Sequence, residues 1–193
     1  MKKRGILFVI SGPSGSGKTT LTNSLLKDAS LRRNLARSIS VTTRPMRTGE
    51  KEARDYFFVT KTEFLRRLRE KKILEWTKYL GYYYGTPKGL VDGYLTRLRS
   101  VVLCLDVRGA KQIKKLYPEN TVTVFVKPPS IDTLPERIKK RCTKTDEQEV
   151  ANRIRCARKE IRESRHYDYL VVNDEFDKAV KDLKKIVIKE MKG

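Results

Sequence analysis

The chain has 193 residues, and its 44 lysines and arginines outnumber its 23 aspartates and glutamates, which gives a net charge of +21. A chain of this length makes one compact domain, and 38% apolar residues supply a core, so the composition excludes a disordered or fibrous protein. About two thirds of the positive excess lies in residues 1–100, and there is no basic tail, which favours an anion-facing surface within the fold. Phosphate groups are the expected anions.

The cysteine and histidine content argues against disulfide and metal frameworks. Cys104, Cys142 and Cys156 form no C-x-x-C pair, and His166 is the single histidine. This set supports neither a disulfide framework nor a zinc site. The apolar run at residues 6–10 is too short for a secretory signal, and no stretch approaches the roughly 18 apolar residues of a membrane span. We therefore expect a cytoplasmic protein without membrane contact.

Apolar runs and helical patterns alternate along the chain. The strand candidates are short, rich in Val, Ile and Leu, and not alternating, which predicts parallel strands buried on both faces. They are residues 6–10, 101–105, 122–126 and 169–172. The helix candidates are residues 18–26, 108–116, 131–141 and 176–191. Pro135 should kink the third helix or delay its start. The alternation predicts an α/β fold, with a parallel sheet flanked by helices.

The middle of the chain interrupts this alternation. Short strand patterns at residues 56–59, 74–79 and 82–84 accompany one amphipathic helix around Phe64, which predicts a small mixed α/β lobe inserted in the sheet. A polar stretch at residues 141–149 separates two helices and has the composition of a lid loop. We expect a single domain over residues 1–193. Its parts are a core at about 1–38 and 98–193, a lid within that core at about 137–153, and the inserted lobe at about 39–97.

The motif from Gly12 to Thr19 matches G-x-x-x-x-G-K-[ST], with an apolar strand before it and a helix pattern after it. The glycines let the backbone wrap a phosphate with its N–H groups. Lys18 places a cation on the β and γ phosphates, and Thr19 offers a hydroxyl to Mg²⁺. The motif therefore implies a P-loop NTPase-type fold that binds a nucleoside triphosphate. The residues expected to hold it are Gly12, Pro13, Ser14, Gly15, Ser16, Gly17, Lys18, Thr19 and Thr20.

A second set of anion-binding side chains follows the phosphate loop. The pattern T-[ST]-R-x-x-[KR]-x-x-[DE], followed by a tyrosine and an aromatic pair, is matched by Thr42, Thr43, Arg44, Arg47, Glu50, Tyr56 and Phe58. This pattern is the signature of the guanylate kinase family, and the chain resembles that family from about residue 5 to residue 189. Further matching stretches are residues 73–76, 81–86, 128–130 and 171–174.

The resemblance implies a Mg²⁺-dependent kinase of purine nucleotide metabolism that transfers the γ-phosphate of ATP to GMP, giving GDP and ADP, and that also accepts dGMP. It implies that the arginine pair Arg44 and Arg47 holds the GMP phosphate together with Tyr56 and Tyr84, because planar guanidinium forks and phenolic donors suit that group. Glu75 would accept from the guanine N1–H and exocyclic amine, and adenine would leave this carboxylate unpaired. The implied GMP-binding residues are Ser40, Arg44, Arg47, Glu50, Tyr56, Glu75, Tyr84, Thr86 and Asp106.

The resemblance also implies the groups that carry catalysis. Phosphoryl transfer needs positioning and charge neutralisation, and the nucleophile is already an anionic phosphate oxygen, so we seek no general base. Arg137 and Arg141 lie one helical turn apart and match arginines that close over the donor phosphates, as does Arg153. The implied catalytic residues are Lys18, Arg44, Arg137, Arg141 and Arg153. Asn173 joins the ATP site, and Thr19, with Asp106 through water, would serve Mg²⁺.

Two departures from the family pattern stand near these groups. Many family members carry two acidic residues at the strand end where this chain has Cys104 and Asp106, so one carboxylate is missing. We expect Cys104 to be a small, buried strand residue. Cys142 replaces a common glycine after the lid arginine, and the lid is one residue longer.

Other functions stay open at this stage. A guanylate-kinase-like interaction module would have lost catalysis, which the intact phosphate loop argues against, and a kinase with a ribose-phosphate acceptor would not need Glu75. The net charge alone suggests nucleic acid, without a stacking or helix-turn-helix motif to support it. The surplus charge is expected on solvated helix faces at residues 66–72 and 153–165. A monomer and a small homo-oligomer are both compatible with the sequence.

Overall fold

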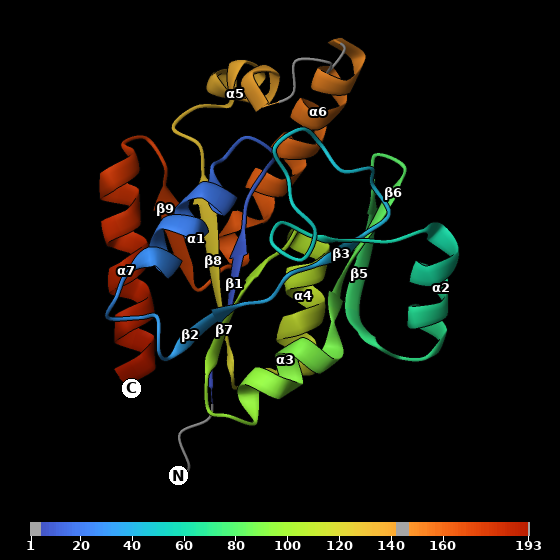
Figure 1. Cartoon of the computed structure of the whole chain (residues 1–193). Coiled ribbons are helices and arrows are strands. Elements are labelled where there is room, and N and C mark those ends of the chain that lie inside the picture. The colour runs from blue at the N-terminus through green and yellow to red at the C-terminus, as the bar shows by residue number, and fades with distance from the viewer. Residues whose placement is uncertain (1–4, 142–146, 193) are drawn as a thin grey trace.

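The computed structural model describes residues 5–141 and 147–192, without the side chain of Arg141. A five-stranded parallel sheet forms its centre, in the order β2-β7-β1-β8-β9 (Figure 1). The strands are β1 (Leu7–Ser11), β2 (Leu35–Arg37), β7 (Ser100–Cys104), β8 (Thr121–Lys127) and β9 (Tyr169–Val172). Because the strands are parallel, the loops that follow them all lie at the same end of the sheet, beyond the carboxyl ends of the strands.

Helices cover both faces of this sheet, as expected from its apolar strands. They are α1 (Lys18–Lys27) and α7 (Phe176–Lys192) on one face, and α3 (Lys88–Leu95) and α4 (Val107–Leu116) on the other (Figure 1). Strand β1 alternates between the two cores: Phe8 and Ile10 pack with α1 and α7, whereas Leu7 and Val9 pack with α3 and α4. The predicted α/β class is therefore confirmed. β2 and α3 have no counterpart among the elements expected from the sequence.

One strand differs from its prediction. β9 was expected to be buried on both faces, but it pairs only with β8 and forms the edge of the sheet. Val171 is buried under α7, while Leu170 and Val172 point away from that core and are 52% and 47% exposed. A short apolar run has the same sequence pattern in a central strand and in an edge strand. The pattern does not distinguish them, because the neighbouring strands in the sheet are distant in sequence.

A second, four-stranded sheet lies beside the first, in the order β4-β3-β6-β5 (Figure 1). Its elements are β3 (Val41–Thr42), β4 (Phe57–Phe58), α2 (Lys61–Arg69), β5 (Ile73–Tyr79) and β6 (Tyr82–Pro87). Leu80 and Gly81 close the β5–β6 hairpin with positive φ angles of 47° and 86°. Phe64 of α2 is fully buried against the ring of Tyr83, and Leu74 of β5 packs on the core under α4.

Two further helices and two 3₁₀ turns lie at the carboxyl end of the parallel strands. They are the 3₁₀ turn η1 (Ile131–Thr133), α5 (Leu134–Arg141), α6 (Glu147–Glu163) and the 3₁₀ turn η2 (Ser164–His166). The start of α5 at Leu134, one residue before Pro135, confirms that the proline delays the α-helix. Residues 142–146 of the expected lid loop, with Cys142, lie outside the described residues. Within the described part of the chain, no helix combines the length and apolar character needed to cross a bilayer.

Candidate active site

The phosphate loop connects β1 to α1 and depends on glycines for its shape. Gly17, the residue before α1, has a left-handed φ of 88°, and a Cβ there would lie 2.2 Å from Asn173 Nδ2. Asn173 follows β9 and donates from Nδ2 to the Ser16 carbonyl at 2.8 Å, so the segment after β9, two strands away from β1 in the sheet, holds the loop in place. Ser16 Oγ is buried without a hydrogen-bond partner among the described residues. Such an unsatisfied donor is suited to an anion in the loop.

The loop presents its cation beside its own backbone. Lys18 Nζ donates to the Pro13 carbonyl at 3.3 Å, and Gly12, Ser14 and Lys18 line a pocket beside the ends of β1 and β7. A Cβ at Gly15 would meet the side chains of Leu134 and Ile138 at 3.3 Å, so α5 rests on the loop. The remaining residues expected to bind ATP, including Thr19 and the exposed Thr20, belong to this loop and the first turn of α1.

Arg44 is a buried cation on the opposite side of the pocket. It follows β3, is 7% exposed, and makes a bidentate ion pair with Glu50, from Nη2 to the two carboxylate oxygens at 2.8 and 2.9 Å. Its guanidinium lies 5.5 Å from the ring centre of Tyr56, whose own ring lies 6.0 Å from Tyr84. Glu50 also accepts from the backbone N–H of Arg47, so one carboxylate outside the pocket lining holds the Arg44 side chain and the Arg47 backbone. Two arginines and two phenols thus face one space.

Glu75 is the most buried carboxylate of the pocket. It lies on β5, is 3% exposed, and accepts a 2.6 Å hydrogen bond on Oε1 from Thr86 Oγ1. Desolvation raises the pKa of Glu75 to about 7, the nearby Asp106 charge adds to the rise, and the Thr86 hydrogen bond opposes it. Ser40 lines the pocket, whereas Thr86 is buried behind Glu75 and directs its hydroxyl proton to it. This arrangement can accept hydrogen bonds from a polar base.

The end of β7 brings a thiol and a second carboxylate to the pocket. Asp106 caps α4 by accepting from the Gly109 backbone N–H at 2.8 Å, and it lines the pocket. Cys104 also lines the pocket and is only half buried, with Sγ donating to Thr22 Oγ1 at 3.3 Å. Cys104 is a strand residue as expected, but the expectation that it is buried is wrong, because β7 ends at this residue and its side chain lines the pocket.

The three arginines of the expected lid differ from one another in their contacts. Arg153 of α6 is 5% exposed and donates from Nη1 to Ser14 Oγ of the phosphate loop at 3.2 Å, so it does not belong to the solvated helix face predicted for residues 153–165. Arg137 of α5 donates from Nη1 to the Asn173 carbonyl at 3.3 Å. Arg141 ends α5, and its side chain lies outside the described residues.

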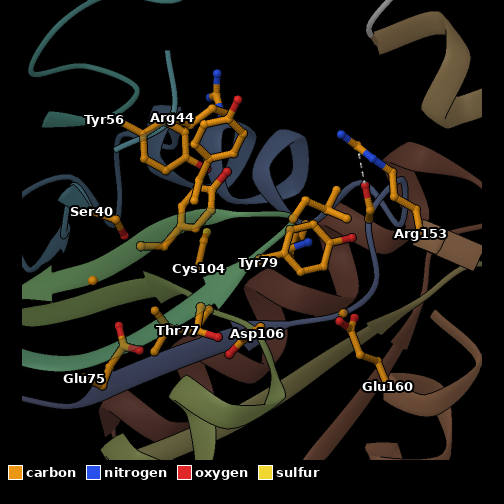
Figure 2. A pocket seen from close by; sticks show the side chains of 18 of the residues that line it. Ser40, Arg44, Tyr56, Glu75, Thr77, Tyr79, Cys104, Asp106, Arg153 and Glu160 are labelled. Atoms are coloured by element: carbon orange, nitrogen blue, oxygen red, sulfur yellow. Dashed lines mark hydrogen bonds between the residues drawn. The ribbon is translucent and has the colours of Figure 1, made fainter. Parts of the chain in front are cut away.

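Many of these groups line one pocket of ≈180 Å³ beside the ends of β1 and β7, whereas Glu50, Thr86, Arg137 and Asn173 support it from outside its lining. Figure 2 shows Arg44 and Tyr56 on one side, Arg153 on the other, and Glu75 and Asp106 below them. The pocket is lined by Gly12, Ser14, Lys18, Ser40, Arg44, Arg47, Tyr56, Glu75, Thr77, Tyr79, Leu80, Tyr82, Tyr84, Gly85, Cys104, Leu105, Asp106, Glu149, Arg153 and Glu160. Cationic groups at both ends and a carboxylate in its depth suit two phosphorylated ligands, one of them carrying a base.

Comparison with known proteins agrees with this geometry. The family model described as "Guanylate kinase" matches residues 4–190 of the chain. The chain belongs to the guanylate kinase family. It is 43% identical to the guanylate kinase of Caldanaerobacter subterraneus subsp. tengcongensis over 98% of this chain and 90% of that protein. It is 42% identical to that of Bacillus subtilis, over 98% and 91%.

A solved structure adds to these sequence similarities. The crystal structure of guanylate kinase from Anaplasma phagocytophilum superimposes with a TM-score of 0.80 at 31% identity, covering 99% of this chain and 88% of that one. Together the relatives make this chain an enzyme that phosphorylates GMP, and they do not favour the interaction module or the kinase with a ribose-phosphate acceptor.

The enzyme also has pocket residues that the sequence analysis does not single out. Glu160 of α6 lines the pocket, where desolvation raises its pKa to about 7 against the lowering effect of the Lys18 charge. Tyr79, at the end of β5, lines the pocket too, and burial raises the pKa of its phenol. A signal for Glu160 exists: seven residues after Arg153, it must share the same face of a helix. Tyr79 has no such signal, because the hairpin tip reaches the pocket only through tertiary packing.

Proposed function

We propose that the enzyme transfers the γ-phosphate of ATP to GMP within this one pocket, with Mg²⁺ as its metal ion. The observation that carries the proposal is that Lys18 and Arg153 both contact the phosphate loop, at Pro13 and Ser14, while Arg44 lies on the opposite side of the pocket from Arg153 (Figure 2). Two anionic substrates held by these cations would meet between them. Phosphoryl transfer between two nucleotides requires this approach of one phosphate to another.

On the donor side, we assign ATP to the phosphate loop. The backbone N–H groups of residues 12–20 would surround the phosphates, with Lys18 on the transferred group and Asn173 holding the loop. Arg153 already reaches the loop at Ser14, and Arg137 and Arg141 on α5 are proposed to complete the cationic lid. Together these arginines would neutralise the charge that develops on the transferred phosphoryl group.

On the acceptor side, we assign the GMP phosphate to Arg44, Arg47, Tyr56 and Tyr84, with Glu50 fixing the guanidinium of Arg44. The guanine base would lie over Glu75, whose carboxylate can accept from both N1–H and the exocyclic amine, and Ser40 would approach O6. The expected contact of Thr86 with O6 is replaced by a contact with Glu75, because the Thr86 hydroxyl is buried and donates to that carboxylate. Adenine offers an unprotonated N1 at this position, so the buried Glu75 carboxylate would keep its bond from Thr86 but lose the N1–H donor of the base. That mismatch is the basis for selecting GMP and dGMP over AMP.

In the proposed step, an anionic phosphate oxygen of GMP forms a bond to the γ-phosphorus, and the bond from that phosphorus to the bridging oxygen of ADP breaks. The electron pair of the broken bond stays on the ADP phosphate, and no proton is abstracted from the nucleophile. Lys18, Arg44 and Arg153 therefore act by position and charge rather than as acid or base. Product release would require the lid arginines to withdraw from the phosphates.

The donor set fits Mg²⁺ bound mainly through phosphates. The described residues contain no group of three His, Cys, Asp or Glu side chains that could hold a metal ion without a nucleotide. Mg²⁺ in kinases takes one or two protein ligands plus substrate phosphates and waters. We propose Thr19, in the first turn of α1, and Asp106, through water, for these places. When bound, the ion neutralises charge on the donor phosphates.

We also propose a domain organisation and a cellular location for the enzyme. Residues 39–87 would form a GMP-binding lobe, hinged on a core of residues 1–38 and 88–193 with its lid at 137–153. The expected lobe boundary at residue 97 is moved because α3 packs on the central sheet. A cytoplasmic location in purine nucleotide metabolism is supported by the free thiols of Cys104 and Cys156, which suit a reducing compartment. Both a monomer and a small homo-oligomer stay compatible with the proposal.

A nucleotide kinase assay coupled to ADP formation tests this proposal. With ATP and Mg²⁺, GMP and dGMP should be phosphorylated, while kcat/KM for AMP and UMP should be at least roughly 100-fold lower. Equal activity on AMP and GMP would refute the assignment of Glu75 to the base. Chelation by EDTA should stop turnover, and Mg²⁺ should restore it. Absence of activity on every acceptor would instead favour an interaction module.

A further inference from the structure

Helix α6 carries an ion pair that the proposed mechanism does not use. Glu149 and Arg153 stand one turn apart, and Glu149 Oε1 accepts from Arg153 Nε at 3.0 Å and also from Nη2. Exposed pairs at this spacing are common and contribute little. This pair is not an exposed pair of that kind, because Arg153 is only 5% exposed. The Glu149 side chain is 35% exposed. Both residues line the pocket.

The two edges of the Arg153 guanidinium have different partners. Nε and Nη2 face Glu149 on the same helix, whereas Nη1 donates to Ser14 Oγ of the phosphate loop, the bond drawn as a dashed line in Figure 2. A guanidinium is planar and its donors form a rigid fork, so a carboxylate that fixes one edge also fixes where the other edge points. Here the other edge points at the loop that would hold the donor phosphates.

We propose that Glu149 is a positioning residue, which holds the Arg153 guanidinium aimed at the phosphate loop before ATP binds. The inference rests on the proposed role of Arg153 toward the donor phosphates. An arginine side chain loses much rotational freedom when it is immobilised by a ligand, and a partner that orders it in advance reduces that loss. Because Glu149 holds the edge turned away from the loop, a phosphate can take Nη1 without displacing the carboxylate.

Steady-state kinetics with ATP varied at saturating GMP measure this effect. Glu149→Ala should lower kcat/KM for ATP roughly tenfold, in the range expected for directly coupled residues. KM for GMP should change less than twofold. Glu149→Gln keeps one oxygen acceptor for the guanidinium and should fall between Ala and the unmodified enzyme. The matched control is Glu147→Ala, which removes an exposed carboxylate from the same first turn of α6 and should leave kcat/KM within twofold.

A double-mutant cycle separates positioning from a general structural effect. In an Arg153→Ala background, Glu149→Ala should lower kcat/KM for ATP less than twofold, because the guanidinium that Glu149 positions is absent. An equal tenfold loss in both backgrounds would overturn the inference, as would a gain in kcat/KM for ATP, which would show that the carboxylate competes with phosphate. If Glu149→Ala alone keeps full activity, only this inference fails. If Arg153→Ala also keeps full activity, the proposed role of Arg153 fails with it. Thermal melting verifies that each variant is folded.

Discussion

Replacing Glu75 by glutamine should make the free enzyme more stable above pH 7 and should impair its use of GMP. The carboxyl is 3% exposed, and desolvation raises its pKa from 4.5 to about 7 in the folded enzyme. Between these two values the native state therefore binds a proton that the unfolded state has lost. Stability contributed by this group is present below pH 4.5 and is lost as the pH rises through 7. Glutamine cannot ionise and keeps that stability.

The size of this effect follows from the two pKa values. Each pKa unit between the folded and unfolded states corresponds to about 1.4 kcal/mol, so the full difference amounts to about 3 kcal/mol above pH 7. The Thr86 hydroxyl can still donate to the amide oxygen, so its 2.6 Å hydrogen bond has an acceptor in the variant. Guanine, however, offers two donors to this side chain, its N1–H and its exocyclic amine. The glutamine amide has only one acceptor oxygen, and its NH₂ group would face the second donor. An unpaired buried donor costs about 1–3 kcal/mol, or roughly a 5- to 150-fold loss in kcat/KM for GMP.

Urea unfolding of Glu75→Gln and of the unmodified enzyme at pH 5, 7 and 8 measures the stability part. The difference between the two should be small at pH 5 and should grow to the calculated size at pH 8. Glu119→Gln, an exposed site, is the matched control and should show no such pH dependence. In the unmodified enzyme, kcat/KM for GMP should rise from pH 6 to pH 8 as Glu75 ionises. A pH-independent stability difference, or unchanged GMP kinetics in Glu75→Gln, would refute this reasoning.

Three further outcomes follow from the site. Lys18→Ala should lower turnover by at least roughly 100-fold with unchanged circular dichroism, because it removes charge from the phosphates and no core packing; a collapsed melting temperature would contradict this. Gly17→Ala should destabilise the enzyme by more than about 1 kcal/mol in thermal melting, since its Cβ would lie 2.2 Å from Asn173 Nδ2. Gly49→Ala, with a φ of 84° but open space around it, should cost less. Finally, kcat/KM should fall as sodium chloride increases, because the positive surface steers anionic nucleotides; a flat response would exclude steering.

The phosphate loop and the alternation of strands and helices could be predicted from the sequence because both are local. Gly12 to Thr19 carries its own backbone requirements, and α1 begins at Lys18 as the pattern predicts. The strand at residues 169–172 has the predicted bounds but not the predicted burial. Whether a strand is central or at an edge depends on which segments pair with it, and no local pattern records that pairing.

The amino-acid sequence by itself determined the family, the α/β class, and the kinds of side chain that meet phosphates and a base. Only the tertiary structure decided which of them face one another. It brings Glu160 beside Lys18, puts Glu50 behind Arg44 instead of in the pocket, and places Cys104, which was expected to be buried, in the pocket lining. The reason is that desolvation and charge pairing depend on groups from distant elements. Those elements become neighbours only when the two sheets and α6 pack around one space.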